Sequence, residues 1–169
     1  MRRLFCILFA LGIGLLAGAQ TRTYTDNETG TFILGLDNYF FGESGTLTFQ
    51  ASGQDIKASV NSGSVSVNGA LLSYGSGDTV IGIHDFTGNR VPELVVARRS
   101  SGSVKADVYS FSGSSWKLVG SAGSTQATEI RVFRQVISIR RGDVLCSWTW
   151  HGSKFDYKAS DGSAEPSLP

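Results

Sequence analysis

An alternation of apolar and polar residues with a period of two runs through most of the chain, and it constrains the fold more than any other feature. Successive side chains of a β-strand point to opposite faces of a sheet, so this period gives each strand one apolar face. The clearest runs are residues 46–51, 56–60, 64–67, 104–111, 129–133 and 144–150. Beyond residue 19, apolar residues do not keep a helical spacing for more than two turns. The pattern therefore predicts an all-β protein.

Glycine and serine pairs separate these runs, and the 21 glycines far outnumber the 3 prolines. Glycine tolerates the positive φ angles that tight hairpin turns require. Strands of alternating pattern joined by such turns are typical of antiparallel sheets. We therefore expect an antiparallel β-meander of hairpins.

One spacing recurs along the chain. Apolar residues at positions i and i+2 are followed by a glycine at i+4 and by two further apolar residues at i+7 and i+9. Copies are centred on Gly69, Gly113 and Gly152, and a looser copy is centred on Gly53. The copies at Gly69, Gly113 and Gly152 follow one another at intervals of about 40 residues, which is the size of a four-stranded propeller blade. A meander with glycine turns also produces such matches by chance.

The repeat predicts blade-like units at residues 79–122 and 128–159, with the preceding strands as a third, less regular unit. Three units are too few to close a propeller ring of four or more blades. We therefore expect an open or stacked arrangement of blade-like repeats, or a sandwich.

The first 19 residues have the three parts of a secretory signal peptide. Two arginines precede the apolar residues 4–16, and the small residues 17–19 follow. This apolar run is shorter than the roughly 20 residues of a membrane-spanning helix. We therefore expect cleavage after Ala19, no membrane anchor, and a secreted or periplasmic protein. The remainder is expected to be a single all-β domain at residues 20–159 and a flexible tail at residues 160–169.

Charge is distributed unevenly over the expected mature chain. Residues 20–89 hold 2 basic and 7 acidic side chains, whereas residues 90–169 hold 11 basic and 7 acidic ones. A basic surface attracts anionic partners. The candidate residues for such a surface are Arg98, Arg99, Arg131, Arg134, Arg140 and Arg141. The alternative is an ordinary solvated face, because alternate residues of an exposed strand face water in any case.

Residues 85–96 read Asp-Phe-Thr-Gly-Asn-Arg-Val-Pro-Glu-Leu-Val-Val. This segment resembles the loop and following strand of FG-GAP and VCBS-type repeats, and the resemblance covers about one repeat, residues 80–119. It implies a propeller-blade type of fold and a role in adhesion or extracellular binding. It also implies a calcium loop, whose ligands in this chain would be Asp85, Thr87, Asn89 and Glu93.

The loop departs from the family pattern at two positions. Thr87 replaces an acid or amide, and Arg90 stands where the loop normally has glycine. Arginine would bring a positive charge close to the cation, and its position favours a glycine backbone. The alternative to a calcium loop is a turn in which the side chains of Asp85 and Asn89 accept hydrogen bonds from backbone amides.

Aromatic residues gather on the repeated hairpins. Trp148 and Trp150 share a strand face, and Trp116 belongs to a similar set on the preceding repeat. An exposed set of this kind would be a platform for sugar rings or for a protein partner. A buried set would be core. Trp116, Trp148 and Trp150 are therefore candidate ligand-binding residues.

Catalytic signatures are scarce in the sequence. It has no nucleophile elbow, no paired-histidine metal motif and no phosphate-binding loop. A hydrolase would have to use His84, Asp85 and His151, but neighbouring strand residues such as His84 and Asp85 point to opposite faces.

We therefore expect a non-enzymatic binding module of FG-GAP-like type, with an unidentified protein or glycan as its partner and no role in nucleic-acid binding. One alternative is a polyanion- or glycan-binding protein that uses the basic C-terminal half. The other is an unrecognised hydrolase.

Overall fold

The computed structural model describes residues 31–168, and the expected signal peptide with its cleavage site after Ala19 lies outside them. The described residues form fourteen strands and no helix, which confirms the all-β prediction. A helix with the length and apolarity needed to cross a membrane is not found between residues 31 and 168.

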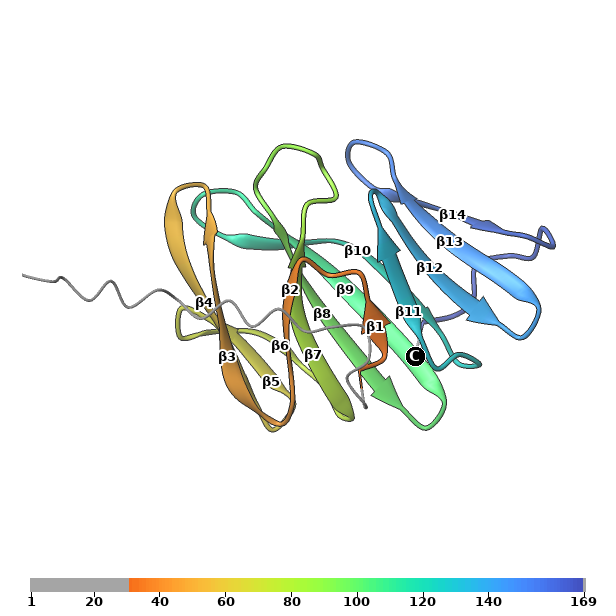
Figure 1. Ribbon diagram of the computed structural model, residues 1–169, viewed down its shortest axis with the longest axis horizontal. Helices are drawn as coiled ribbons and strands as arrows, with labels where there is room; N and C mark the ends of the chain where they lie inside the picture. The colour runs from red at the N-terminus through yellow and green to blue at the C-terminus, as the bar shows by residue number, and fades with distance from the viewer. Residues whose placement is uncertain (1–30, 169) are drawn as a thin grey trace, which may run out of the picture.

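The strands are arranged in three sheets, here named A, B and C (Figure 1). Sheet A has the order β1 (Ile33–Leu34), β11 (Ile130–Phe133), β12 (Val136–Arg141), β13 (Val144–Trp150), β14 (Phe155–Ala159). Sheet B has the order β10 (Trp116–Ser124), β9 (Ser103–Phe111), β8 (Glu93–Ser100), β7 (Asp78–His84), β2 (Asn38–Phe41). Sheet C has the order β3 (Ser44–Ala51), β4 (Gln54–Asn61), β5 (Ser64–Val67), β6 (Ala70–Tyr74). Neighbouring strands are antiparallel throughout, except that β1 runs parallel to β11.

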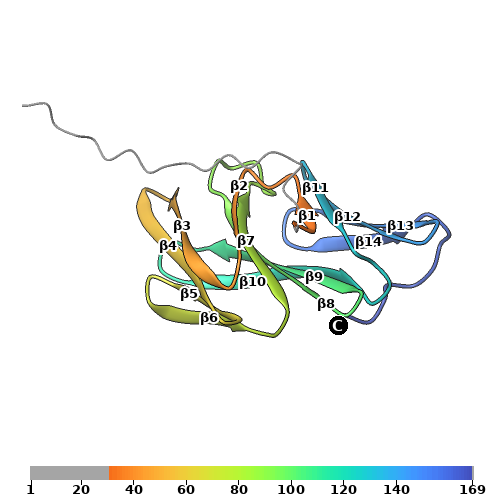
Figure 2. The same ribbon diagram turned by 60° about the horizontal axis from the view of Figure 1, so that its bottom comes forward.

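The sheets are stacked, with sheet B in the middle (Figure 2). One apolar core lies between sheets A and B, and a second lies between sheets B and C. Strand β8 contributes to both, because Val95 and Ala97 point into the first core while Leu94 and Val96 point into the second. A strand that is covered on both faces loses the alternation of polar residues, which explains its continuous apolar run.

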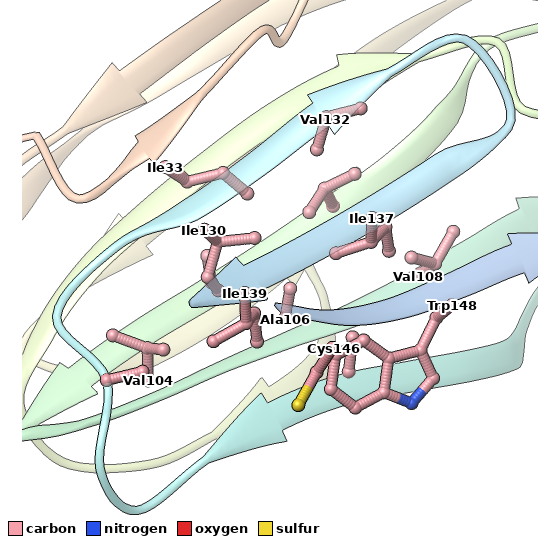
Figure 3. Close-up of a cluster of buried hydrophobic side chains, with 14 of the residues drawn as sticks. Ile33, Val104, Ala106, Val108, Ile130, Val132, Ile137, Ile139, Cys146 and Trp148 are labelled. Carbon is pink, nitrogen blue, oxygen red and sulfur yellow. The ribbon is translucent and has the colours of Figure 1, made fainter. Parts of the chain in front are cut away.

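The core between sheets A and B is built from the inward faces of β11, β12 and β13 on one side and of β9 on the other. Figure 3 shows its side chains, among them Ile130, Ile137, Ile139, Cys146 and Trp148 of sheet A and Val104, Ala106 and Val108 of sheet B. Cys146 is a free and fully buried thiol. It packs as a small apolar side chain in this core.

The sheets are meanders of hairpins, and none of them closes into a barrel. The repeated spacing falls on the last hairpin of each sheet: Gly69 lies between β5 and β6, Gly113 between β9 and β10, and Gly152 between β13 and β14. All three glycines have positive φ, between 72° and 89°. The expected antiparallel meander is therefore confirmed, with the sheets in an open stack.

Residues 33–41 do not belong to the sheet formed by the strands that follow them. Strand β1 adds to the edge of sheet A beside β11, and β2 adds to the edge of sheet B beside β7. The third unit therefore consists of β3 to β6 alone. Strands β7 to β10 lie within residues 78–124, and β11 to β14 lie within residues 130–159.

The segment after β14 lies against sheet A. The indole N–H of Trp148 donates a hydrogen bond to Glu165 Oε1 at 2.6 Å, and Arg141 donates one to the Ser163 hydroxyl at 3.3 Å. The flexibility expected of residues 160–169 stays a prediction.

Candidate functional site

The loop between β7 and β8 is closed by the side chain of Asp85. Its Oδ1 accepts hydrogen bonds from the backbone N–H groups of Gly88 (2.8 Å) and Asn89 (3.2 Å), and its Oδ2 accepts one from Arg90 N–H (2.8 Å). The Asn89 Oδ1 in turn accepts a hydrogen bond from the backbone N–H of Val91 at 2.7 Å. This is the side-chain-to-backbone turn that the sequence left open as the alternative to a calcium loop.

Glu93 is buried at the start of β8, with 2% of its surface exposed. Its Oε2 accepts a hydrogen bond from the Phe86 backbone N–H at 2.8 Å, and its Oε1 accepts one from the Thr87 hydroxyl at 3.3 Å. Burial raises the pKa of the Glu93 carboxyl above its ordinary value, and the nearby Asp85 charge raises it further, while the bond from Phe86 partly offsets both.

The structure brings Asp85, Thr87 and Glu93 together, but the Asn89 oxygen is turned to Val91. Calcium takes six to eight oxygen ligands directed at one centre. Here all four carboxylate oxygens of Asp85 and Glu93 already receive an N–H or O–H donor. No group of three His, Cys, Asp or Glu side chains between residues 31 and 168 is placed to hold a metal ion. This arrangement does not fit calcium, and the calcium loop stays a prediction of the family resemblance.

Arg90 adopts a φ of 67° in this loop. This left-handed conformation is favourable for glycine and costly for a residue with a Cβ. Arg90, which stands where an FG-GAP-type loop normally has glycine, therefore has a backbone conformation that glycine adopts more easily.

The imidazole of His84 lies between two polar groups from other elements. Its Nε2 is 2.6 Å from the carbonyl oxygen of Arg134, and its Nδ1 is 3.2 Å from Asp37 Oδ2. The first contact requires a proton on Nε2, because a carbonyl oxygen only accepts. His151 lies in the β13–β14 turn, where its backbone pairs with Lys154 and Ser153. Among residues 31–168, no hydrogen bond or ion pair joins His84 to His151 or to the side chain of Asp85.

The expected aromatic platform is wrong for two of its three residues. Trp148 is 1% exposed and Trp150 is 8% exposed, because both indoles fill the core between sheets A and B. They pair across the hairpin with Tyr157 and Phe155, as the shared strand face implied. Neither ring is open to a ligand in solution. Trp116 is partly buried at the start of β10, where it packs on Phe111 with ring centroids 5.0 Å apart.

The six candidate arginines do not form one surface. Arg98 and Arg99 are adjacent on β8 and therefore point to opposite faces of sheet B. Arg98 donates a hydrogen bond to the Gly63 carbonyl at 3.2 Å, whereas Arg99 pairs with Asp78 at 2.7 Å. Burial lowers the pKa of the Arg98 guanidinium, and Asp107 offsets part of this change. Arg98 and Arg99 therefore do not share one surface, and a ligand-binding role for either stays a prediction.

Two further arginines are engaged elsewhere. Arg141 donates to Ser163, as described above, and Arg134 lies over the ring of Phe133 at 5.2 Å from its centroid. Arg141 follows Arg140 directly in β12, so the alternation separates this doublet as it separates the first. Arg131 and Arg140 remain on one common face.

That face is the solvent side of β11 to β14, which we call the outer face of sheet A. Ile130, Ile137, Cys146 and Ala159 point into the core, so their neighbours point outward. The strand register aligns four outward residues in one row across the sheet, in the order Arg131, Ser138, Ser147, Lys158. Arg140 lies two residues after Ser138 on β12, on the same face, and its partner on β13 is Leu145.

A hollow of about 610 Å³ opens on the outer face of sheet A. Arg131, Ser138 and Arg140 line it from the strands, and residues 126–129 line it from the β10–β11 loop. Arg131 is paired with Glu129 at 2.6 Å. The exposed guanidinium of Arg140 makes no hydrogen bond or ion pair with any residue from 31 to 168, so its N–H donors are available to a ligand.

Sequence reasoning named both arginines of this hollow but missed its other lining residues. Ser138 carries no catalytic or binding motif, and the sequence pattern marked Glu129 only as the start of an expected strand at residues 129–133. The period of two puts Ser138 and Arg140 on the same side of β12. Only the strand register shows that Arg131 lies beside them.

No protein-family model, no curated protein and no solved structure matches the chain. The similarity to FG-GAP and VCBS-type repeats stays an interpretation of residues 85–96 and of the hairpin spacing.

Proposed function

We propose that the protein is an exported, non-enzymatic binding module that holds an anionic polymer on the outer face of sheet A. The observation that carries this proposal is the Arg140 guanidinium, which has no hydrogen-bond or ion-pair partner among residues 31–168 and lies in an open hollow beside Arg131. Of the functions considered from the sequence, this is the polyanion-binding alternative, restricted from six arginines to the two that share a face.

The shape of the face suits an extended chain better than a small ion. Lys158 on β14 is exposed and makes no ion pair with any described residue, and it lies three strands away from Arg131. Adjacent strands are about 4.8 Å apart, so the row from Arg131 to Lys158 spans roughly 14 Å. A polymer with repeated carboxylate or sulfate groups would meet the two cations of this row, Arg131 and Lys158, and also Arg140 beside it. A single small anion would meet one or two.

The binding should depend strongly on salt. Exposed charges interact weakly one by one and are screened over about 10 Å at 0.1 M ionic strength. Affinity for a polymer then comes from several simultaneous contacts, each of which weakens as salt is added.

The test uses the mature protein, residues 20–169, on a column of immobilised polygalacturonate at low salt. Wild type should be retained and should elute as the salt rises, and Arg140→Gln should elute at a clearly lower salt concentration. Lys57→Gln is the matched control, because Lys57 is an exposed cation on the solvent side of sheet C. Passage of wild type in the void volume, or equal shifts for the two variants, would contradict the proposal.

A second candidate is an FG-GAP-like adhesion module with a calcium-dependent loop. It is supported by the convergence of Asp85, Thr87 and Glu93 at the entrance to the buried strand β8. Because every carboxylate oxygen of the loop already has a donor, we expect millimolar calcium to leave the melting temperature of the mature protein unchanged. A rise in melting temperature that disappears in Asp85→Asn would favour this second candidate.

A further inference from the structure

Two hollows, which we together call the groove, flank the segment that leaves strand β6, on the opposite side of sheet B from sheet A. They share Tyr74, Gly75 and Ser76 as a common wall. The first, of about 400 Å³, also touches β8 and β9. The second, of about 660 Å³, extends to the β2–β3 connection. Both volumes lie within the roughly 300–1,000 Å³ that small-molecule sites occupy.

The first hollow contains a charged group that the fold has largely withdrawn from water. Asp107 is 8% exposed, and its Oδ1 accepts a hydrogen bond from the Ser121 hydroxyl at 2.6 Å and lies 3.6 Å from Lys105 Nζ. Burying a carboxylate is costly unless it is paired, so its position needs these partners. Within residues 31–168 the Asp107 Oδ2 atom receives no hydrogen bond, which leaves an acceptor beside the Lys105 ammonium donor.

Gly75, in the wall that the two hollows share, lies against the side chain of Arg98. A Cβ at Gly75 would lie 2.8 Å from Arg98 Nε, which is closer than real side chains approach. The Arg98 guanidinium passes beneath this position to reach Gly63. The hydroxyls of Ser73, Ser76, Ser100 and Ser103 line the same hollow.

Tyr74 stands where the two hollows meet, and 76% of its surface is exposed. A single exposed aromatic ring is common on protein surfaces, so its place beside the hollows is what makes it a candidate contact. Tyr74 lines both hollows.

We propose that this groove binds a neutral oligosaccharide, with one sugar ring stacked on Tyr74 and hydroxyls of the next ring held by Asp107 and Lys105. A sugar hydroxyl both donates and accepts, so it matches a carboxylate and an ammonium placed side by side. A peptide strand added to β6 is a poorer match, because strand addition relies on alternating side-chain pockets and this groove is lined mainly by glycine, serine and charged residues. The site lies on sheets B and C and does not depend on the outer face of sheet A.

The test is calorimetric titration of the mature protein with neutral tetrasaccharides of glucose, of mannose and of N-acetylglucosamine. At least one should bind, Tyr74→Ala should weaken that binding about tenfold, and Tyr74→Phe should retain it because the ring is kept. Phe133→Ala is the matched control, since Phe133 is 69% exposed on the outer face of sheet A.

Tyr74 is exposed, so its replacement should leave the circular dichroism spectrum and the melting temperature unchanged. Arg140→Gln should bind the tetrasaccharide as wild type does, which separates this site from the polymer-binding face. The proposal is overturned if none of the three sugars binds where a Kd of about 1 mM would be measured. Binding that survives Tyr74→Ala would overturn it as well.

Discussion

At the scale of single residues, residues 85–93 combine a strained backbone at Arg90 with a buried carboxylate at Glu93. Arg90 holds a left-handed conformation, and Glu93 is a carboxylate buried between a backbone amide and a hydroxyl. Arg90 lies in the connection between β7 and β8, and Glu93 is the first residue of β8. Each leads to a separate and measurable effect on stability.

Replacement of Arg90 by glycine should stabilise the protein. The left-handed conformation costs an L-residue about 1–2 kcal/mol, and the greater freedom of glycine in the unfolded chain offsets part of the gain. We expect Arg90→Gly to raise the free energy of unfolding in urea by about 0.5–1 kcal/mol. Gly88→Ala is the converse variant: Gly88 has a φ of 72° and open space around it, so strain alone should lower stability. A loss of stability in Arg90→Gly would contradict this account of the loop.

Glu93 should make stability depend on pH. Its folded pKa is raised above the ordinary value of 4.5, so the folded state holds the proton more tightly than the unfolded state does. The stabilisation from this proton is fully present below about pH 4.5 and is lost as the pH rises through the folded pKa. The free energy of unfolding of wild type minus that of Glu93→Gln should therefore fall as the pH rises from 4.5. Parallel curves for the two proteins between pH 4 and pH 8 would show that Glu93 does not titrate in this way.

At the scale of strands and hairpins, much of the arrangement could be predicted from local pattern. Gly69, Gly113 and Gly152 mark the final hairpin of each sheet, because a tight turn needs positive φ and the flanking apolar residues must share a face. Strand β8 could be recognised from its apolar run. The partners of β1 and β2 could not be predicted, since their pairings with β11 and β7 are long-range and leave no periodic signal.

The candidate site was predictable to a smaller extent, for a related reason. Composition identifies a basic half, but alternation along β8 and β12 separates the residues of both arginine doublets. Which arginines meet depends on the register between strands. The sequence pattern could not show whether the tryptophans are core or an exposed platform, because both arrangements place them on one strand face. The outcome depends on whether another sheet covers that face.

The segment after β14 should stabilise sheet A through one hydrogen bond. Trp148 is 1% exposed, and its indole N–H donates to Glu165. Glu165→Ala would leave a buried donor without a partner, which typically costs about 1–3 kcal/mol. Glu165→Gln keeps an acceptor and should lose much less. Chemical denaturation followed by tryptophan fluorescence would measure both variants, and equal stability of Glu165→Ala and wild type would refute the contact.

At the scale of the whole molecule, the stack ends in two polar faces of different character. The solvent side of sheet C carries an uncharged row, Thr46, Ser59 and Ser66, in which the first two hydroxyls are 3.2 Å apart. The outer face of sheet A carries the cations Arg131, Arg140 and Lys158 and also the acids Glu129 and Asp156. The terminal repeats of a repeat protein have a polar outer face that can be exposed to water. The polar outer faces of sheets A and C have the same effect, so the stack of three sheets can end at them without closing into a ring. In the proposed function, an anionic polymer binds at the sheet A end because of the cations there.

The most direct measurement of this claim is the change of backbone amide chemical shifts in the mature protein as polygalacturonate is added at low salt. We predict that the shifts concentrate on the outer face of sheet A, at Arg131, Ser138, Arg140 and Lys158, and that they shrink as salt is added. The solvent side of sheet C should stay unchanged. Shifts spread evenly over both ends of the stack, or confined to sheet C, would contradict the proposed function.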